Sequence, residues 1–246
     1  MSKGLVLIPA RYESSRFPGK PLVPLLSKSM IRHVFENMLQ SSMDVYVVTD
    51  NQKIEDHVRS FTDKVLRVDD DVSTGTDRIY LAYQRFFQDQ GYDYICNVQG
   101  DEPLLQGQTL LELMKFHQQS RFDVTTLIRP VEGHSDDFND PNIVKSVYDE
   151  ITGSCLYFSR SPVPYDRDGK SKCWYQHIGV YLFKASALEE YMGLKKSEIE
   201  NIEALEQLRA LSGGMSIGAI KTKEILIGVD LPKDVIKVEA YLSGKA

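Results

Sequence analysis

The sequence has few of the residues and segments that mark some protein classes at once. Its 246 residues include three cysteines and one tryptophan, and no apolar run approaches the roughly 18 to 20 residues that cross a bilayer. The cysteines lie far apart and form neither a C-x-x-C pair nor a zinc pattern with histidines. We therefore expect no membrane span, and we assign the cysteines no chemistry.

The chain also lacks an excess of positive charge. Its net charge is −6, which argues against general binding of nucleic acid or of an anionic membrane, although a local basic pocket is compatible with it. The first residues show no charged segment followed by a long apolar one. We therefore expect no signal peptide and a cytoplasmic location.

The first stretch with a clear chemical character is Leu5–Lys20. It opens with the apolar run Leu5–Ile8, which suits a strand buried on both faces of a parallel sheet. The loop that follows carries Arg11, Arg16 and Lys20 among serines and a glycine, and this combination suits a phosphate-bearing ligand. Neither the P-loop spacing nor the G-x-G-x-x-G pattern is present, so the positive charge must come from side chains. The alternative is a solvated basic surface loop.

Strand-like and helix-like stretches alternate after this loop. Short apolar strands are expected at Val45–Thr49, Lys64–Val68 and Tyr92–Val98, with amphipathic helices between them. This alternation predicts an α/β fold with a mainly parallel sheet and right-handed crossovers. Because ligands bind beyond the carboxyl ends of such strands, the basic loop lies where a site is expected.

The alternation stops in the second half of the chain. Short strands without a helical pattern indicate an antiparallel subdomain at about residues 129–183, inside a single domain of residues 1–246. Beyond it we expect one helix over Ser197–Leu211 that starts with a capping box. A last strand is expected over Glu224–Val229, and Asp230 after it is a good N-cap for a terminal helix.

A carboxylate, Asp101, follows the strand predicted at Tyr92–Val98. Mg²⁺ prefers one or two carboxylates together with phosphate oxygens, so a carboxylate at a strand end opposite a phosphate-binding loop is suited to hold it. The alternative for the D-E-P sequence at Asp101 is the acidic first turn of a helix.

Motifs spread over nearly the whole chain resemble those of the CMP-Kdo synthetases, which activate 3-deoxy-manno-octulosonate (Kdo) with CTP. The resemblance is closer to these enzymes than to the sialic-acid cytidylyltransferases that share their fold. The motifs are P-A-R-Y-x-S-S-R-F-P-G-K-P-L at residues 9–22, S-T-G-T-D-R at 73–78, N-V-Q-G-D-E-P at 97–103, L-Y-F-S-R at 156–160, H-I-G-V-Y at 177–181, L-E-Q-L-R at 205–209 and G-V-D-L-P at 228–232.

The resemblance implies a fold and an activity. The fold is a GT-A-like α/β nucleotidyltransferase with a mixed, mainly parallel sheet and an antiparallel excursion for sugar binding and dimerisation. The activity is transfer of CMP from CTP to the anomeric hydroxyl of Kdo, with release of pyrophosphate, for lipopolysaccharide biosynthesis. A homodimer that uses Mg²⁺ is implied, with neither nucleic acid nor a membrane as partner.

The resemblance also implies roles for individual residues. For catalysis it implies Arg16, Lys20 and Asp101, and for Mg²⁺ it implies Asp101 and Asp230. For CTP it implies Ala10, Arg11, Ser14, Ser73, Gly75, Thr76, Arg78 and Gln99. For the sugar acid it implies Arg160, His177, Tyr181, Glu206 and Gln207.

Several of these residues have simpler interpretations. The hydroxyl residues of S-T-G-T could cap the following helix, His177 could be a hydrogen-bonded structural residue, and Glu206 and Gln207 could be a solvated helix flank. Arg160 has an argument of its own, because a planar guanidinium binds a carboxylate through two hydrogen bonds. The sugar acid carries such a carboxylate beside its anomeric carbon.

Other functions remain open at this point. The acceptor could be the 8-amino analogue of Kdo or a sialic acid instead of Kdo. A chain of another class, a non-catalytic regulator that binds a nucleotide sugar, is a further alternative. The complete cationic loop and the two acidic positions argue against that regulator, because a binding module does not need two metal carboxylates.

Overall fold

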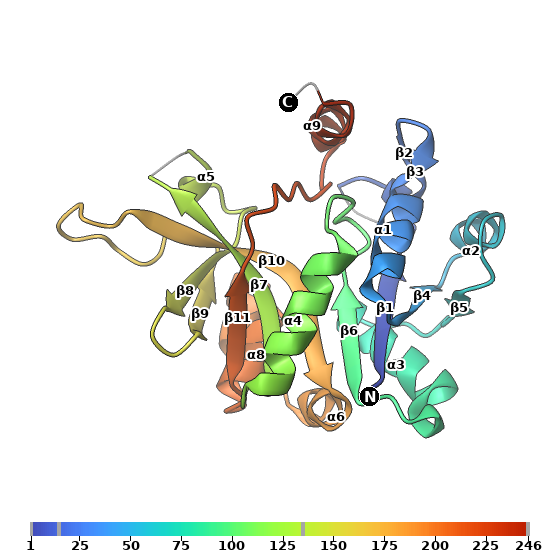
Figure 1. The fold of residues 1–246 in the computed structure, drawn as a ribbon, viewed down its shortest axis with the longest axis horizontal. Helices are drawn as coiled ribbons and strands as arrows, with labels where there is room; N and C mark the ends of the chain where they lie inside the picture. The colour runs from blue at the N-terminus through green and yellow to red at the C-terminus, as the bar shows by residue number, and fades with distance from the viewer. Residues whose placement is uncertain (1, 14–15, 134–135, 245–246) are drawn as a thin grey trace. The chain divides into compact units, whose positions relative to one another are not determined.

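Figure 1 shows the computed structural model of the protein, in which residues 2–13, 16–133 and 136–244 are described. The backbone divides into two compact units, called unit 1 (Met1–Leu111 with Ile225–Ala246) and unit 2 (Glu112–Glu224). The subdomain predicted at about residues 129–183 falls within unit 2. Among the described residues, no helix is long and apolar enough to cross a membrane.

Unit 1 contains a parallel sheet with β1 (Gly4–Ala10) inside it. On one side β1 pairs with β4 (Asp44–Thr49), which in turn pairs with β5 (Val65–Arg67), and on the other side β1 pairs with β6 (Tyr94–Val98). All seven residues of β1 are buried, as in a strand covered on both faces. The parallel sheet and the first buried strand predicted from the sequence are therefore confirmed.

Helices follow the strands of unit 1 (Figure 1). Helix α1 turns its apolar side chains inward, since Ile31, Val34 and Phe35 are all buried. The helices are α1 (Met30–Met38), α2 (Gln52–Arg59), α3 (Gly75–Phe86), the start of α4 (Gly107–Gln119) and α9 (Pro232–Leu242); 3-10 turns lie at Lys20–Leu22, Leu39–Ser41 and Gln88–Gln90, and a hairpin joins β2 (Pro24–Leu25) to β3 (Lys28–Ser29).

Unit 2 contains a mixed set of strands. The longest, β10 (Cys173–Lys184), runs antiparallel to β7 (Val124–Glu132), with an irregularity in the ladder between Ile178 and Tyr181. β7 also pairs in parallel with β11 (Ile217–Lys221). The remaining elements are β8 (Lys145–Asp149) and β9 (Ser154–Ser159), which pair antiparallel, and the helices α5 (Asp136–Asn139), α6 (Ala185–Gly193), α7 (Glu198–Glu203) and α8 (Gln207–Ser212). The predicted change to antiparallel pairing is therefore present in this unit.

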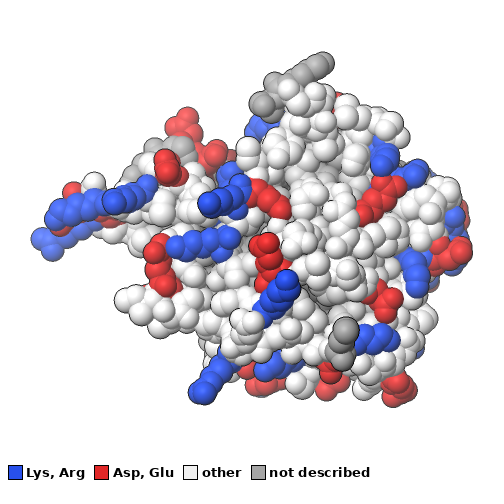
Figure 2. Space-filling view, in the orientation of Figure 1, with Lys and Arg blue, Asp and Glu red and all other residues white. Residues whose placement is uncertain are grey.

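Charged side chains of both signs are interspersed on the face of the molecule drawn in Figure 2. Several of the charged side chains form ion pairs with a nearby residue. For example, Arg32 Nε lies 2.7 Å from Glu36 Oε1. Exposed pairs of this kind contribute little to stability, so the fold rests mainly on its buried apolar strands and helix faces.

The strand predicted at Glu224–Val229 is wrong. No strand forms there, and the last strand is β11, which ends at Lys221. Leu226 and Val229 are buried in the protein. Buried positions need apolar residues, so this segment has the apolar sequence of a strand without being one. The Val229 N–H donates to the carbonyl oxygen of Asp101 (3.0 Å), and this bond ties the segment to the loop after β6.

The predicted N-cap role of Asp230 is also wrong. Leu231 occupies the N-cap position of α9. The carboxylate of Asp234, in the first turn of the helix, accepts from the N–H groups of Leu231 (2.9 Å) and Asp230 (3.2 Å). Because Asp234 satisfies these amides, the carboxylate of Asp230 is available for other contacts.

The single helix predicted over Ser197–Leu211 is two helices in the structure. Ala204 has a φ of 50°, which separates α7 from α8. Ser197 does cap α7, since its Oγ accepts from the Glu200 N–H (3.2 Å). Glu200 does not complete a capping box, because its carboxylate pairs with Arg209 of α8 (2.6 Å) in a buried ion pair.

The close approach of α4 to the end of α1 depends on Gly107. A Cβ atom at this position would lie 2.6 Å from the carbonyl oxygen of Asn37 and 2.7 Å from the amide nitrogen of Ser41, and backbone atoms cannot rotate away. We expect Gly107→Ala to lower the free energy of unfolding by about 1–3 kcal/mol, as overpacking does, in urea denaturation. Gly193→Ala, where a Cβ meets nothing within 4 Å, is the control and should stay within about 0.5 kcal/mol of wild type. Equal losses in both variants would contradict this account of Gly107.

Candidate functional site

Three of the residues predicted for catalysis or metal binding in unit 1 meet at one ammonium group. The Nζ of Lys20 donates to Asp101 Oδ2 (2.6 Å), to the carbonyl oxygen of Val229 (3.2 Å) and to Asp230 Oδ1 (3.4 Å). Lys20 opens a 3-10 turn after the first loop, Asp101 lies beyond β6, and Asp230 precedes α9. Segments that are far apart in the sequence therefore bring a cation and two carboxylates together.

Burial and charge act on this cluster in opposite directions. Burial by itself lowers the pKa of Lys20, but the carboxylates of Asp101 and then Asp230 outweigh it and raise this pKa above its ordinary value. Burial, together with the charges of Asp101 and Asp230, raises the pKa of the neighbouring Glu102 to about 8. At neutral pH Lys20 is therefore charged, while Glu102 is mostly protonated.

The two arginines of the first loop make different contacts. Arg16, which is half exposed, places its guanidinium 3.2 Å from Asp230 Oδ1 and so joins the Lys20 cluster. Arg11 donates to the carbonyl oxygens of Val72 (3.0 Å) and Ser73 (3.4 Å). Arg11 therefore links the first loop to the segment that leads into α3.

Two further residues predicted for CTP lie in or beside the first loop. Ala10 is the last residue of β1 and is buried, with 2% of its surface exposed. Ser14 lies outside the described residues. The loop runs from Ala10, at the end of β1, to Lys20, and Arg16 is its first described residue after Ser14.

The capping alternative holds for one hydroxyl residue before α3. Thr74 is the N-cap, since its Oγ1 accepts from the Asp77 N–H (3.1 Å) while Asp77 Oδ2 accepts from the Thr74 N–H (3.0 Å). Ser73 does not cap the helix in this way, and its carbonyl oxygen accepts from Arg11.

The residues around the first turn of α3 approach the ends of β1 and β6. A Cβ atom at Gly75 would lie 3.1 Å from Cγ of Pro9 and 3.6 Å from Oε1 of Gln99, so the absence of a side chain permits a tight contact. Thr76 Oγ1 accepts from Asn97 Nδ2 (2.9 Å), and Asn97 Oδ1 accepts from Gln99 Nε2 (3.5 Å). The structure thus brings Gly75, Thr76 and Gln99 together.

Arg78 does not lie with these residues at an accessible surface. Its side chain is only 2% exposed, and its guanidinium pairs with Asp50 Oδ2 (2.6 Å). It also donates to the carbonyl oxygen of Val68. Arg78 therefore joins the segments that follow β4 and β5 from inside the protein.

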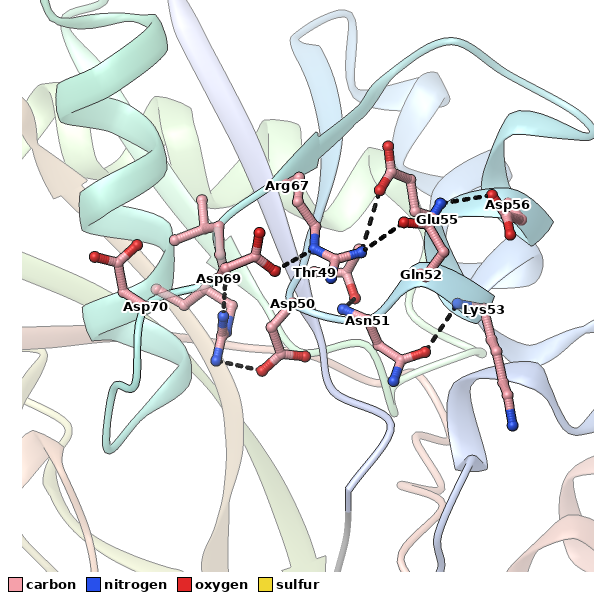
Figure 3. A network of polar contacts seen from close by, with 12 residues as sticks. Thr49, Asp50, Asn51, Gln52, Lys53, Glu55, Asp56, Arg67, Asp69 and Asp70 are labelled. Carbon is pink, nitrogen blue, oxygen red and sulfur yellow. Dashed lines mark hydrogen bonds and ion pairs between the residues drawn. The ribbon is translucent and has the colours of Figure 1, made fainter.

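A polar network surrounds these two segments in unit 1 (Figure 3). Arg67 contacts Glu55 (3.3 Å), Gln52 (3.3 Å) and Asp69. Asn51 caps α2 by accepting from the Lys53 N–H (2.9 Å). The network holds the carboxyl ends of β4 and β5 in place, close in sequence to the segment that Arg11 contacts.

In unit 2, the guanidinium of Arg160 is held by backbone carbonyl groups. It donates to the carbonyl oxygens of Glu203 (2.7 Å), Pro141 (2.9 Å) and Ala204 (3.3 Å). A guanidinium has five N–H groups, and among the described residues these carbonyls account for three of them. Within the described part of the chain the guanidinium forms no ion pair, so two of its N–H groups are available for a bidentate partner.

The other residues predicted for the sugar acid in unit 2 lie close to one another. His177 is buried, with Nε2 3.0 Å from Thr126 Oγ1, and its ring centre is 5.5 Å from that of Tyr181. The Tyr181 hydroxyl donates to Gln207 Oε1 (3.1 Å), and Gln207 Nε2 is buried without a partner among the described residues. Glu206 is the N-cap residue of α8, next to Gln207. A buried donor without a partner is the kind of group that a polar ligand satisfies.

Comparison with known proteins identifies the chain's relatives. A family model described as cytidylyltransferase matches residues 5–217. The chain is 40% identical over 252 residues to the 3-deoxy-manno-octulosonate cytidylyltransferase of Thermodesulfovibrio yellowstonii, with 97% of this chain and 98% of that protein covered. The chain belongs to the CMP-Kdo synthetase family. It is accordingly a cytidylyltransferase, and its resemblance to this family is confirmed.

A solved structure and a second relative extend this assignment. The structure of CMP:2-keto-3-deoxy-manno-octonic acid synthetase complexed with CTP is 34% identical, covers 100% of both chains and gives a TM-score of 0.90. The 8-amino-3,8-dideoxy-manno-octulosonate cytidylyltransferase of a Shewanella species is 37% identical over 244 residues, with 97% of this chain and 98% of that protein covered. This member of the CMP-Kdo synthetase family therefore has an α/β nucleotidyltransferase fold, and its relatives include enzymes named for two different sugars.

Sequence reasoning assigned no role to three polar residues that the structure makes prominent. They are Asp50, the partner of Arg78; Glu102, beside the Lys20 cluster; and Lys145, the first residue of β8, which is fully buried. A lysine inside the apolar sequence I-V-K-S-V is the signal that would have found Lys145. Asp50 and Glu102 carry no comparable signal, because acidic residues after strands are common.

The titration of His177 makes stability depend on pH. Burial lowers the pKa of His177 to about 3 from an ordinary value of 6.5. Below pH 6.5 the unfolded chain binds a proton that the native protein excludes, so the free energy of unfolding falls as the pH drops towards 3. Between pH 7.5 and pH 5, wild type should lose about 2 kcal/mol more than His177→Gln in urea denaturation. An equal loss in both proteins would show that His177 is not held neutral by burial.

Proposed function

We propose that the protein transfers CMP from CTP to the anomeric hydroxyl of Kdo and releases pyrophosphate, for lipopolysaccharide biosynthesis. The observation that carries this proposal is the cluster of Lys20, Asp101 and Asp230 beyond the parallel strands of unit 1. Such a set supplies cationic and anionic groups for a triphosphate and its metal ion. Membership of the CMP-Kdo synthetase family supports CTP as the nucleotide and Kdo as the acceptor.

The proposed CTP site consists of residues in unit 1. Arg11, Arg16 and Lys20 would neutralise the triphosphate, because the first loop presents all three cations. The base and ribose would lie against the segment before α3 and the end of β6, where close backbone approach is possible. The residues proposed there are Ala10, Ser14, Ser73, Gly75, Thr76 and Gln99. Arg78 is proposed to support this site from inside the protein, since its guanidinium is buried on Asp50.

A Mg²⁺ ion fits the two carboxylates of this cluster. Asp101 and Asp230 both reach one cationic atom, Lys20 Nζ, so their oxygens already converge on a point of positive charge. Among the described residues no group of three or more His, Cys, Asp or Glu is placed to hold a metal, and Mg²⁺ commonly takes one or two carboxylates with phosphate oxygens. We propose that Lys20 exchanges a carboxylate for a phosphate when the nucleotide and Mg²⁺ bind.

The proposed sugar-acid site consists of residues in unit 2. Arg160 would bind the carboxylate of the sugar through the N–H groups that its carbonyl contacts leave over. Gln207 would donate to a sugar hydroxyl through Nε2, which has no partner among the described residues, with Tyr181 fixing its amide. Glu206 and His177 complete the proposed set.

The proposed chemistry is an in-line displacement at the α-phosphorus of CTP. The anomeric oxygen of the sugar forms a bond to phosphorus, the bond to the pyrophosphate oxygen breaks, and the hydroxyl proton passes to solvent. A pKa of about 3 makes His177 a poor proton acceptor, so it is not proposed as a general base. Mg²⁺, when bound, supplies charge neutralisation and lowers the pKa of the attacking hydroxyl. Arg16 and Lys20 would stabilise the negative charge that develops on the phosphates.

Several finer features stay predictions. They are the GT-A-like form of the fold, a smaller subdomain for sugar binding and dimer contact, a homodimer and a cytoplasmic location. The second candidate acceptor is the 8-amino analogue of Kdo, because a relative at 37% identity is named for that sugar.

Pyrophosphate release tests the proposed function. With CTP and Mg²⁺, we expect release in the presence of Kdo, and the 8-amino analogue and a sialic acid serve as comparison acceptors. Release with the 8-amino sugar alone would keep the chemistry and overturn the proposed acceptor. No release with any of the three acceptors would reject the transferase proposal in favour of a nucleotide-sugar-binding role.

Substitution of Asp101 tests the metal site. Asp101→Asn removes the charge that Mg²⁺ needs, so we expect kcat to fall about 100-fold or more, the scale of losing one key electrostatic contact. Asp93→Asn is the matched control, since the Asp93 carboxylate accepts from the Lys3 N–H (2.8 Å) away from the cluster. Circular dichroism checks that both variants fold. Asp101→Asn with normal turnover and an unchanged Mg²⁺ response would remove Asp101 from the site.

A further inference from the structure

Lys145 is a buried cation at the start of β8 in unit 2. Its side chain has no solvent exposure. Its Nζ donates to the carbonyl oxygens of Arg160 (2.6 Å), Ile143 (2.7 Å) and Asp140 (2.9 Å). An ammonium group has three N–H donors, so these three carbonyls satisfy all of them.

Burying the ammonium group of Lys145 costs desolvation free energy, which disfavours a purely stabilising role for this residue. Burial lowers the pKa of Lys145, the carboxylates of Asp140 and Glu203 oppose this effect, and the charge of Arg160 adds to it. Carbonyl oxygens, not a carboxylate, hold the ammonium of Lys145. Taking an ammonium group out of water costs free energy that hydrogen bonds to carbonyl groups only partly offset, so stability alone does not explain a lysine at this position.

The three carbonyl groups that Lys145 holds all belong to Arg160 or to the turn that its guanidinium contacts. One is the carbonyl of Arg160 itself. The other two, at Asp140 and Ile143, belong to the turn that contains Pro141, whose carbonyl oxygen accepts from the Arg160 guanidinium (2.9 Å). Lys145 therefore fixes both the backbone from which Arg160 extends and the turn against which its guanidinium rests.

The strands around Lys145 explain why it reaches both places. Lys145 is opposite Ser159 in the β8–β9 ladder, one residue before Arg160, and opposite Gln176 in the β8–β10 pairing. The Ser159 hydroxyl and the Arg160 N–H both donate to the carboxylate of Glu203, at 2.6 Å and 2.9 Å. Glu203 thus holds the backbone N–H of Arg160, and Lys145 holds its carbonyl oxygen.

We infer that Lys145 is a positioning residue that sets the guanidinium of Arg160 for the carboxylate of the sugar acid. This inference rests on the proposed function, in which Arg160 binds that carboxylate. Lys145 itself is buried and touches no substrate.

The test replaces Lys145 by methionine, which has a similar length and no charge. We expect Lys145→Met to raise the KM for the sugar acid about tenfold or more, while the KM for CTP stays within about twofold, because a misplaced Arg160 weakens only the carboxylate contact. Lys221→Met is the matched control. Lys221 is a partly exposed lysine of unit 2 that pairs with Glu150 (2.8 Å), and its loss should leave both KM values unchanged.

An acceptor without a carboxylate separates positioning from general loss of structure. In a Kdo analogue whose carboxylate is reduced to a primary alcohol, Arg160 has no anion to bind. Lys145→Met should then cost little relative to wild type acting on the same analogue. An equal loss with both acceptors, or an equal rise in the KM for CTP and for the sugar, would overturn the inference.

Two further variants keep the outcomes distinct. Arg160→Ala tests the proposed role of Arg160 directly, and if it does not reduce the preference for the carboxylate-bearing acceptor, the proposed sugar site is wrong. If Arg160→Ala reduces that preference and Lys145→Met does not, the positioning role alone is wrong. Should Lys145→Met fail to fold, Lys145→Gln, whose amide can donate to part of the carbonyl set, carries the same comparison.

Discussion

The ammonium group of Lys20 is the contact on which the candidate site in unit 1 depends. Asp101 and Asp230 carry like charges that would repel each other at the end of the parallel sheet, and Lys20 holds both. The surrounding chain keeps these carboxylates available, because Asp234 satisfies the amides at the start of α9 in place of Asp230. Glu102, beside them, adds little negative charge at neutral pH since burial and its acidic neighbours raise its pKa. The cluster therefore keeps the charges that a triphosphate and a metal ion would use.

The cations of the candidate site in unit 2 have a different kind of hydrogen-bond partner. The guanidinium of Arg160 and the ammonium of Lys145 are both held by backbone carbonyl oxygens. Carbonyl dipoles satisfy the N–H groups without cancelling the charge, whereas a carboxylate partner would do both. In unit 1 the cation Lys20 pairs with two anionic side chains, whereas in unit 2 the charged groups of Arg160 and Lys145 form no ion pair among the described residues, although the Glu203 carboxylate lies on the backbone N–H of Arg160.

The sequence predicted the parts of the fold that depend on local pattern. The alternation that gives β1, β4, β5 and β6, and the helices between them, follows from apolar periodicity, and the structure has these elements. The strand predicted at Glu224–Val229 is wrong because apolar residues such as Leu226 and Val229 can be buried without forming a hydrogen-bonded ladder. The N-cap of α9 was predicted wrongly because aspartate is a preferred cap residue and leucine is not, yet Leu231 takes the N-cap position. Asp234, the third residue of the helix, accepts from the N–H groups of Leu231 and Asp230 instead.

Local sequence patterns also predicted only part of the candidate site. Motifs indicated Lys20, Asp101 and Arg160, because cations and carboxylates after strands have a recognisable chemistry. Long-range contacts decided the rest: Arg78 is buried on Asp50, and Lys145 holds the carbonyl of a residue that follows it by a whole hairpin. No spacing rule in the sequence encodes such contacts.

Magnesium binding, measured by isothermal titration calorimetry with and without a CTP analogue that cannot release pyrophosphate, tests the role of Lys20 most directly. In wild type, Lys20 competes for Asp101 and Asp230, so we predict weak Mg²⁺ binding without the nucleotide and much tighter binding with it. In Lys20→Met, Asp101 loses its cation while Asp230 keeps its contact with Arg16, and Mg²⁺ alone should bind about tenfold tighter than to wild type. Equal affinities of the two proteins for Mg²⁺ alone would contradict the claim that Lys20 holds the metal carboxylates.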